Sequence, residues 1–318
     1  MTKETVEAAF SSLWNDLKEG ASFPTQRPLL AHYTSIAVLE QIMAHDELWF
    51  SNPLQMNDLE ELRFGMNEGA FAFRSHQDLR NSCGDDKRYQ ALLQAFDHYF
   101  SEFDEKYVFD TYVLCLSKQD TDGLLSMWRG YGGNGSGAAI IFDTAKLSQV
   151  ENSPLILSEV KYASSEERVN WIHGKLGEVA KLIADLEVPD TELYLVAYYF
   201  LERLKLFAIF TKHHGFREEQ EWRIVYLSER DREKRFESML KYMIGPRGIE
   251  PKLKFKVTHI DGLTAHDLSL EKLVHQIILG PTASSPMTVK AVQRMLEKLG
   301  KASIATKVIS STTPFRQR

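Results

Sequence analysis

Cysteine is scarce in this chain of 318 residues, which contains only Cys83 and Cys115. The two form no Cys-x-x-Cys pair, and no cluster of cysteine and histidine has the spacing of a zinc site. This count argues against a disulfide framework and is typical of a protein from a reducing compartment.

The chain also has no excess of positive charge, with 38 Lys and Arg residues against 44 Asp and Glu residues. The formal net charge is −6 at pH 7, so the chain has no general basic field that would attract nucleic acid. A local basic cleft stays open as an alternative, but the overall charge does not point to one.

Long apolar runs are missing as well. The most apolar window, Leu193–Phe210, is broken by charged side chains at 202, 203 and 205, so it favours a buried helix over a membrane span. The first twenty residues carry acidic side chains and predict no signal peptide. They show a helical stripe of apolar residues instead, namely Val6, Phe10, Leu13, Trp14 and Leu17. We expect a soluble, cytoplasmic protein with no membrane partner.

The chain does have enough apolar residues, 43% of the total, to build a sizeable core. Short β-rich runs alternate with helical patterns, which predicts an α+β protein with a mixed sheet. We expect an N-terminal helix and linker over 1–27 and a single domain over 28–318, with a helical insertion at about 60–106 that covers one side of the sheet. The expected strands are 28–34, 48–51, 112–117, 138–142, 160–162, 221–226, 276–279 and 302–309, and further helices are expected at 36–43, 124–131, 165–212 and 288–299. The last two strands and the helix between them predict a β-α-β crossover.

The run from Phe210 to Leu227 holds the most informative pattern. If the strand begins early enough, Glu219, Glu221 and Arg223 share one face, and the other face is apolar. Two carboxylates at the mouth of a strand suit an enzyme that stabilises a sugar cation. The alternative is a solvated Glu-Arg ion pair on an edge strand, packed beside a tryptophan.

Other polar positions allow two interpretations each. His32 is either a hydrogen-bonded core histidine or the wall of a pocket. The glycine run at 130–137 lacks the Gly-Lys-Ser/Thr ending of a phosphate loop and favours a tight turn. Cys115 lies among apolar neighbours and favours an inert core thiol. His213 and His214 are adjacent and have no third ligand, so we predict no metal site.

An ordered set of short motifs resembles the bacterial domain-of-unknown-function 2971 family. They are His-Tyr-Thr (32–34), Leu-Trp-Phe-Ser (48–51), Met-Asn-Asp-x-x-Glu (56–61), Cys-x-Ser (115–117), Met-Trp-x-x-Tyr (127–131), Lys-x(6)-Glu-x-Glu-Trp-Arg (212–223), Ile-Ile-Leu-Gly-Pro (277–281) and Ser-x-x-Pro-Phe-Arg (311–316). The resemblance covers residues from about 30 to 316.

That family in turn resembles the ADP-ribosyltransferase superfamily, whose enzymes bind NAD in a cleft of a split β-sheet. The resemblance implies three strand-borne positions, which here match His32, Ser117 and Glu221, with Glu219 two residues before the last. Further NAD contacts are implied for Tyr33, Thr34, Trp128, Arg129 and Tyr131, and ordinary packing is the alternative for Trp128.

The activity implied is NAD-dependent ADP-ribosyl transfer to a macromolecular acceptor, a protein or a nucleic acid, in a toxin or phage-defence effector. Glu221 would stabilise the ribosyl cation and Glu219 would orient the acceptor. An antitoxin or regulatory protein is the expected partner. Two alternatives stay open: a non-catalytic nucleotide-binding or regulatory module of the same fold, and an NAD glycohydrolase.

Overall fold

The computed structural model describes residues 3–16, 26–56, 59–119, 122–147, 153–245 and 248–314, with only the main chain of 59–61. The chain forms two compact units, each built from three segments. We call them the helical unit (Met1–Ala21, Pro53–Asp110, Val160–Gly215) and the sheet unit (Ser22–Asn52, Thr111–Glu159, Phe216–Arg318). Leu17 of the predicted stripe, residues 57–58 of the Met-Asn-Asp-x-x-Glu motif and residues 315–316 of the last motif lie outside the described residues.

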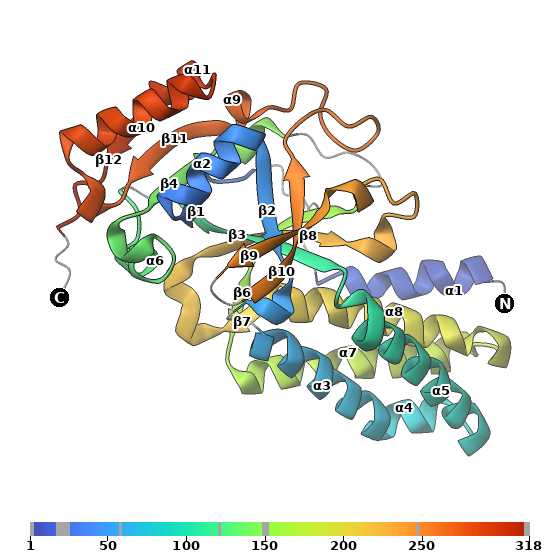
Figure 1. Cartoon of the computed structure of the whole chain (residues 1–318). Coiled ribbons are helices and arrows are strands. Elements are labelled where there is room, and N and C mark those ends of the chain that lie inside the picture. The colour runs from blue at the N-terminus through green and yellow to red at the C-terminus, as the bar shows by residue number, and fades with distance from the viewer. Residues whose placement is uncertain are drawn as a thin grey trace. The chain divides into compact units, whose positions relative to one another are not determined.

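The helical unit is built mainly of helices (Figure 1), and aromatic side chains such as Phe73, Phe96 and Phe200 pack against one another between α3, α5 and α8. Its elements are α1 (Lys3–Phe10), η1 (Ser11–Trp14), η2 (Pro53–Gln55), α3 (Leu59–Ser75), α4 (Gln77–Ser82), α5 (Asp86–Glu102), η3 (Phe103–Tyr107), β6 (Lys161–Ala163), α7 (Ser165–Leu186), η6 (Asp190–Glu192), α8 (Leu193–Ile209) and β7 (Thr211–His213). The helical prediction for 60–106 is confirmed, and that for 165–212 is confirmed over α7 and α8 but wrong at 211–212, which belong to β7. The break in the first is made by Gly84, which has a φ of 81°, and by Asp85, whose side chain caps α5.

The sheet unit carries all the residues that the sequence nominates for a site. Its elements are β1 (Leu30–Thr34), α2 (Ile36–His45), β2 (Glu47–Ser51), β3 (Thr111–Lys118), α6 (Leu125–Gly130), η4 (Gly133–Gly135), β4 (Ala138–Phe142), η5 (Thr144–Lys146), β5 (Leu155–Glu159), β8 (Glu221–Leu227), η8 (Ser228–Arg230), η9 (Glu237–Met239), β9 (Leu240–Gly245), β10 (Gly248–Lys256), α9 (Leu270–Leu273), β11 (Val274–Leu279), η10 (Pro281–Ala283), α10 (Pro286–Lys298), α11 (Ala302–Ala305) and β12 (Val308–Ser310). The turn η7 (His214–Glu219) leads from β7 into β8.

The strands form one open, mostly antiparallel sheet in the order β12-β11-β4-β1-β3-β2-β10-β9, with β8 and then β5 joined to β3. The strands β11 and β12 run parallel and the chain between them forms α10, so the predicted β-α-β crossover is confirmed. The mixed α+β class is confirmed too. The predicted strand at 302–309 is wrong over 302–307, because α11 forms there after Gly300, which has a φ of 77°, and β12 begins only at Val308.

The sheet forks at β3. One edge of β3 pairs with β8 along its length, from Thr111 to Ser117. The other edge pairs with β1 only at its end, through Ala31 and Ser117, and with β2 only near its start, through Ser51 and Val113. The strands β1 and β2 therefore diverge from the middle of β3.

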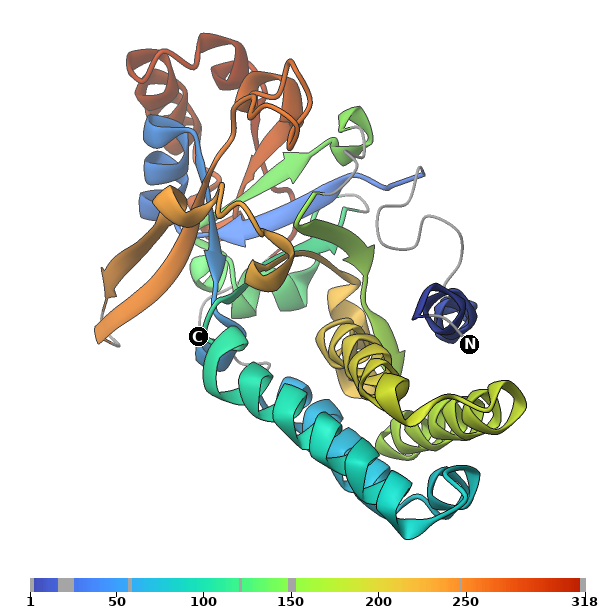
Figure 2. The same ribbon diagram turned by 90° about the vertical axis from the view of Figure 1, so that its right-hand side faces the viewer.

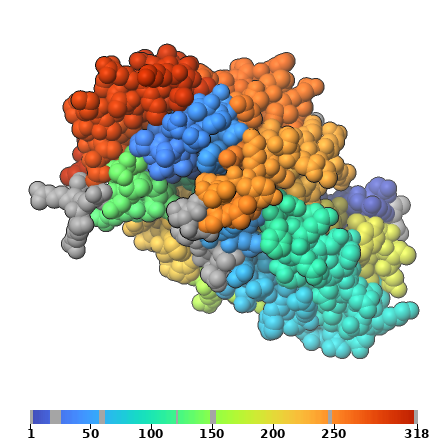
Figure 3. All heavy atoms as spheres, in the orientation of Figure 1, coloured from blue at the N-terminus to red at the C-terminus, as the bar shows by residue number. Residues whose placement is uncertain are grey.

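Two apolar clusters cover the two faces of the sheet. On what we call the α2 face, Leu30, Leu116 and Trp222 pack with residues of α2 and α10, and α2 lies beside α10 at the surface (Figure 3). On what we call the α6 face, Ala31 and Tyr33 pack with residues of α6. The hairpin of β9 and β10 projects from the sheet (Figure 2) and was not predicted, although residues 252–256 alternate strictly between lysine and an apolar residue, which is the signal that could have found β10.

Candidate functional site

Strand β8 begins at Glu221, two residues later than a shared face for Glu219 and Glu221 requires. Gln220 has a φ of 44°, in the left-handed region, and this kink places Glu219 at the end of η7 instead of on the strand. The prediction that Glu219 extends the strand is therefore wrong. Its side chain accepts a hydrogen bond from the Tyr131 hydroxyl at 3.1 Å, so it points toward the end of α6.

Ser117 and Glu221 face one another across two neighbouring strands. They are paired in the antiparallel register of β3 and β8, and directly opposed residues share a face of the sheet. Ser117 is completely buried, and its hydroxyl donates a short hydrogen bond of 2.5 Å to the Glu219 carbonyl. Because Ala31 is paired with Ser117 on the other side, this face is the α6 face.

The carboxylate of Glu221 is engaged by Arg223 in a two-pronged ion pair. The guanidinium Nε lies 2.8 Å from Oε1 and Nη2 lies 3.0 Å from Oε2, and each side chain is only 5% exposed. From the sequence, the alternative is a solvated ion pair on an edge strand. That alternative is wrong in its location, because the pair is buried and β8 lies between β3 and β5. A buried, bidentate pair keeps both groups charged where an isolated charge would be costly.

His32 lies in the fork between β1 and β3. Its Nδ1 is 3.1 Å from the Cys115 carbonyl, in the stretch of β3 that β1 leaves unpaired. Strand alternation places it on the α2 face, because Ala31 and Tyr33 on either side of it belong to the α6 face. The structure therefore brings Ser117 and Glu221 together, and His32 joins them only through the main chain of β3.

The ring of His32 is held in the neutral form. Burial lowers its pKa, and the hydrogen bond to the Cys115 carbonyl opposes that effect only in part. Since a carbonyl only accepts, Nδ1 carries the proton and Nε2 of the neutral ring is left as an acceptor.

Tyr33 and Trp128 are both part of the core on the α6 face. Their rings meet edge to face at 4.9 Å, and Trp128 has no exposed surface. The Tyr33 hydroxyl accepts a hydrogen bond from the Leu124 main chain at 3.0 Å, and burial raises its pKa. Packing, the alternative given above for Trp128, is what these contacts support, and this conformation offers neither ring face to a ligand.

A loop residue that the sequence did not nominate, Asp122, ties the C-terminal segment to this core. Its carboxylate accepts hydrogen bonds from Ser311 Oγ at 2.9 Å, Thr312 N at 2.6 Å and Thr313 Oγ1 at 3.0 Å. Burial raises the pKa of Asp122, but these hydrogen bonds outweigh it and lower the pKa overall. The Ser-x-x-Pro motif of the sequence thus has a structural function, which only the fold reveals.

The remaining predicted residues differ in exposure. Arg129 is exposed at the end of α6, and Tyr131 is 41% exposed and bonded to Glu219. Thr34 is buried at the end of β1, where its carbonyl lies so close to Gly137 that a Cβ there would approach within 2.2 Å. The glycine run is a tight turn, as predicted, with Asn134 and two glycines at positive φ.

Two searches of the described residues bear on the class of site. No group of three or more His, Cys, Asp or Glu side chains among them is placed to hold a metal ion. Nor does any helix in the described ranges combine the length and the apolar character needed to cross a membrane.

The comparison with protein families returns one match, to a family described as Protein of unknown function (DUF2971), over residues 127–224. That range is less than half of the chain. It takes in Trp128 and Glu221 but neither His32 nor Ser117, and it supports the family resemblance there. No curated protein and no solved structure matches the chain.

Proposed function

We propose that the sheet unit is an NAD-dependent ADP-ribosyltransferase domain acting on a macromolecular acceptor. The observation that carries the proposal is the direct pairing of Ser117 with Glu221 on adjacent strands, with β1 next to β3 at the same position. The family resemblance implies a middle-strand serine and a last-strand glutamate, and these two residues meet that requirement through chain segments a hundred residues apart.

The proposed reaction transfers the ADP-ribosyl group of NAD to the macromolecular acceptor. The bond from C1′ of the ribose to the nicotinamide nitrogen breaks, and nicotinamide leaves with the bonding electrons. Positive charge builds on the ribose, as it does in glycoside hydrolysis. A nucleophilic atom of the acceptor then bonds to C1′ and loses its proton.

Glu221 is suited to stabilise this charge because it is fixed and shielded from water. A carboxylate in a dry site acts more strongly on a nearby cation than one in water does. Arg223 engages both carboxylate oxygens in the ion pair, so it must release one of them when Glu221 acts on the ribose.

His32 has a positioning role in this proposal, because it lies on the opposite face of the sheet from Glu221. Its Nδ1 donates to the Cys115 carbonyl and so holds β1 beside the part of β3 with which it is not paired. The exposed Arg129 is a donor for the diphosphate, and Glu219, positioned by Tyr131, orients the acceptor. For Tyr33 and Trp128 we propose a positioning role, since they hold the loop before α6.

The test incubates the full chain with NAD that is labelled in its adenylate phosphate, together with a cell lysate. We expect label in a macromolecule and a loss of about 100-fold or more in Glu221→Gln. Arg223→Met is the matched control, because it breaks the same ion pair and keeps the carboxylate. Glu218→Gln, an exposed neighbour, controls for charge alone.

Glu221→Gln should retain NAD binding in calorimetry, because it keeps the shape of the side chain and removes only its charge. Equal loss of labelling in Glu221→Gln and Arg223→Met would contradict the catalytic role, because it would make the ion pair a purely structural element. Release of free ADP-ribose without labelled macromolecule would assign the site to NAD hydrolysis instead.

A second candidate, the non-catalytic nucleotide-binding or regulatory module, is favoured by a specific observation. Both oxygens of Glu221 are occupied by Arg223, and the aromatic rings nearest β1 are packed away. This module would bind NAD or a related nucleotide with no turnover in any variant. Binding of NAD in calorimetry, together with no labelling of a macromolecule, is the outcome that would establish it.

A further inference from the structure

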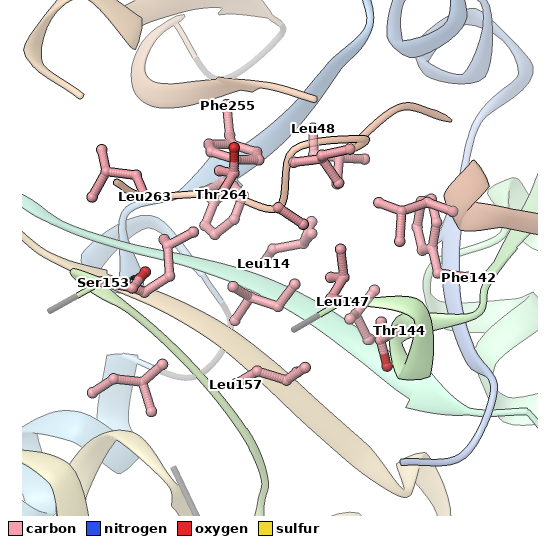
Figure 4. A pocket seen from close by; sticks show the side chains of 18 of the residues that line it. Leu48, Leu114, Phe142, Thr144, Leu147, Ser153, Leu157, Phe255, Leu263 and Thr264 are labelled. Carbon is pink, nitrogen blue, oxygen red and sulfur yellow. Dashed lines mark hydrogen bonds between the residues drawn. The ribbon is translucent and has the colours of Figure 1, made fainter. Parts of the chain in front are cut away.

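A cavity of about 290 Å³ opens within the sheet unit, on the α2 face (Figure 4). Its walls come from β3, β5 and β8 on one side and from β2, β10 and the segment 263–268 on the other. It is about twice the size of an engineered apolar cavity that takes up benzene, so it has room for a small organic molecule.

This cavity is separate from the pair of Ser117 and Glu221. Leu116 of β3 and Ile224 of β8 line the cavity. Leu116 directly precedes Ser117, and Ile224 lies three residues after Glu221 on the same strand. Successive side chains of a strand point to opposite faces. A molecule in the cavity would therefore lie behind the sheet, on the face away from Ser117 and Glu221.

The walls are almost wholly apolar. Leucine, isoleucine, phenylalanine and alanine supply all but four of the lining residues. An unfilled apolar space is unfavourable, because the side chains around it lose dispersion contacts. A wall of this composition selects a hydrocarbon chain or ring as its occupant.

One end of the cavity offers a positive charge. Ser153 and Leu263 lie at this end in Figure 4, and the backbone of 154 is hydrogen-bonded to Leu227, immediately before η8. The last residue of η8, Arg230, lines the cavity and is exposed. Within the described part of the chain it makes no hydrogen bond or ion pair, so its guanidinium is available to an anion.

The opposite end holds a buried hydroxyl that lacks a partner. Thr144 lies beside Phe142 at that end in Figure 4 and is 2% exposed. Among the described residues its Oγ1 has no hydrogen-bond partner, although a buried hydroxyl normally has one. A polar atom near the far end of a bound chain would provide it.

We propose that this cavity binds a medium-chain carboxylate, with the carboxylate at Arg230, the chain along the apolar walls and a hydroxyl near its far end at Thr144. The charge at one end and the orphan hydroxyl at the other together define this class. The proposal is independent of the proposed function, and its tests use no NAD.

Calorimetry of the full chain with decanoate, decan-1-ol and 10-hydroxydecanoate tests each element. We expect decanoate to bind about tenfold more tightly than decan-1-ol, because its charge meets Arg230. Shortening the chain should weaken binding about fourfold for each methylene removed. The hydroxylated acid should bind about fivefold more tightly than decanoate.

Variants locate the ligand. Arg230→Gln should remove the preference for the acid over the alcohol, while Arg232→Gln, an exposed arginine two residues away that does not line the cavity, should keep it. Leu147→Trp fills the cavity from a partly exposed position and should abolish binding of all three ligands. Thr144→Val should equalise decanoate and its hydroxylated form.

The proposal is overturned if none of the three ligands binds the wild type, or if Leu147→Trp binds them as the wild type does. Equal loss of binding in Arg230→Gln and Arg232→Gln would also overturn it, because the interaction would then depend on overall charge. Equal affinities of decanoate and 10-hydroxydecanoate for the wild type would remove Thr144 from the site. The thermal midpoint of each free variant shows whether it is folded.

Discussion

Replacing Glu221 by glutamine should destabilise the sheet unit, because it leaves the buried guanidinium of Arg223 without its carboxylate. Removing one partner of a buried ion pair typically costs about 3–5 kcal/mol of unfolding free energy. Glutamine keeps one acceptor oxygen, and both residues have further polar partners, so we expect a loss at the low end, about 3 kcal/mol. Urea unfolding followed by tryptophan fluorescence measures it, and Trp222 on the same strand reports on the region.

A double-mutant cycle separates the pair from its surroundings. Arg223→Met should also cost about 3 kcal/mol, because it strands the Glu221 charge. The double variant should lose much less than the sum of the two, with a coupling of about 2 kcal/mol or more. If the two losses instead add to within about 0.5 kcal/mol, the two side chains do not depend on each other and the reasoning is refuted.

Two further predictions concern pH. The pKa of His32 is lowered in the folded state, so its contribution to stability is fully present above the unfolded pKa of about 6.5 and is lost as the pH falls through the lower, folded value. The difference between the urea midpoints at pH 7.5 and 5.0 should therefore be smaller in His32→Gln than in the wild type, and equal differences would contradict this. The pKa of Asp122 is also lowered, so its contribution to stability is present above the unfolded pKa of about 3.8 and is lost as the pH falls through the folded pKa. Asp122→Asn should lower the free energy of unfolding by about 1–3 kcal/mol at pH 7 and by less at pH 3, and an equal loss at both would argue against hydrogen bonding to the charged form.

The strands that carry the candidate site could be predicted because burial on both faces leaves a clear signature. Residues 112–117 and 138–142 are apolar runs, and they form the centrally placed β3 and β4. The pairing of Ser117 with Glu221 could not be derived from them, because register depends on which strands meet. It entered only through the family resemblance.

The position of Glu219 could not be predicted for a different reason. Alternation assumes that the strand continues, and it ends at a single residue, Gln220, in a conformation that glutamine rarely adopts. The sequence gives no glycine or proline there as a warning. The cavity was missed because its lining comes from many segments, each of which reads as ordinary core.

The buried pair of Glu221 and Arg223 needs an explanation that stability does not supply. A well-packed apolar pair of similar volume is often as stable as a buried ion pair or more so. Two charges at alternate positions of a central strand, opposite a buried serine, are therefore better explained by a need for charge at this place. Both proposed functions explain that need, because in each a charged group of a bound nucleotide would contact this pair. They differ in whether Arg223 must release an oxygen of Glu221, and this is why Arg223→Met is the informative variant: it frees the carboxylate, so labelling persists if Glu221 acts on the ribose and stays absent if the pair only shapes a binding surface.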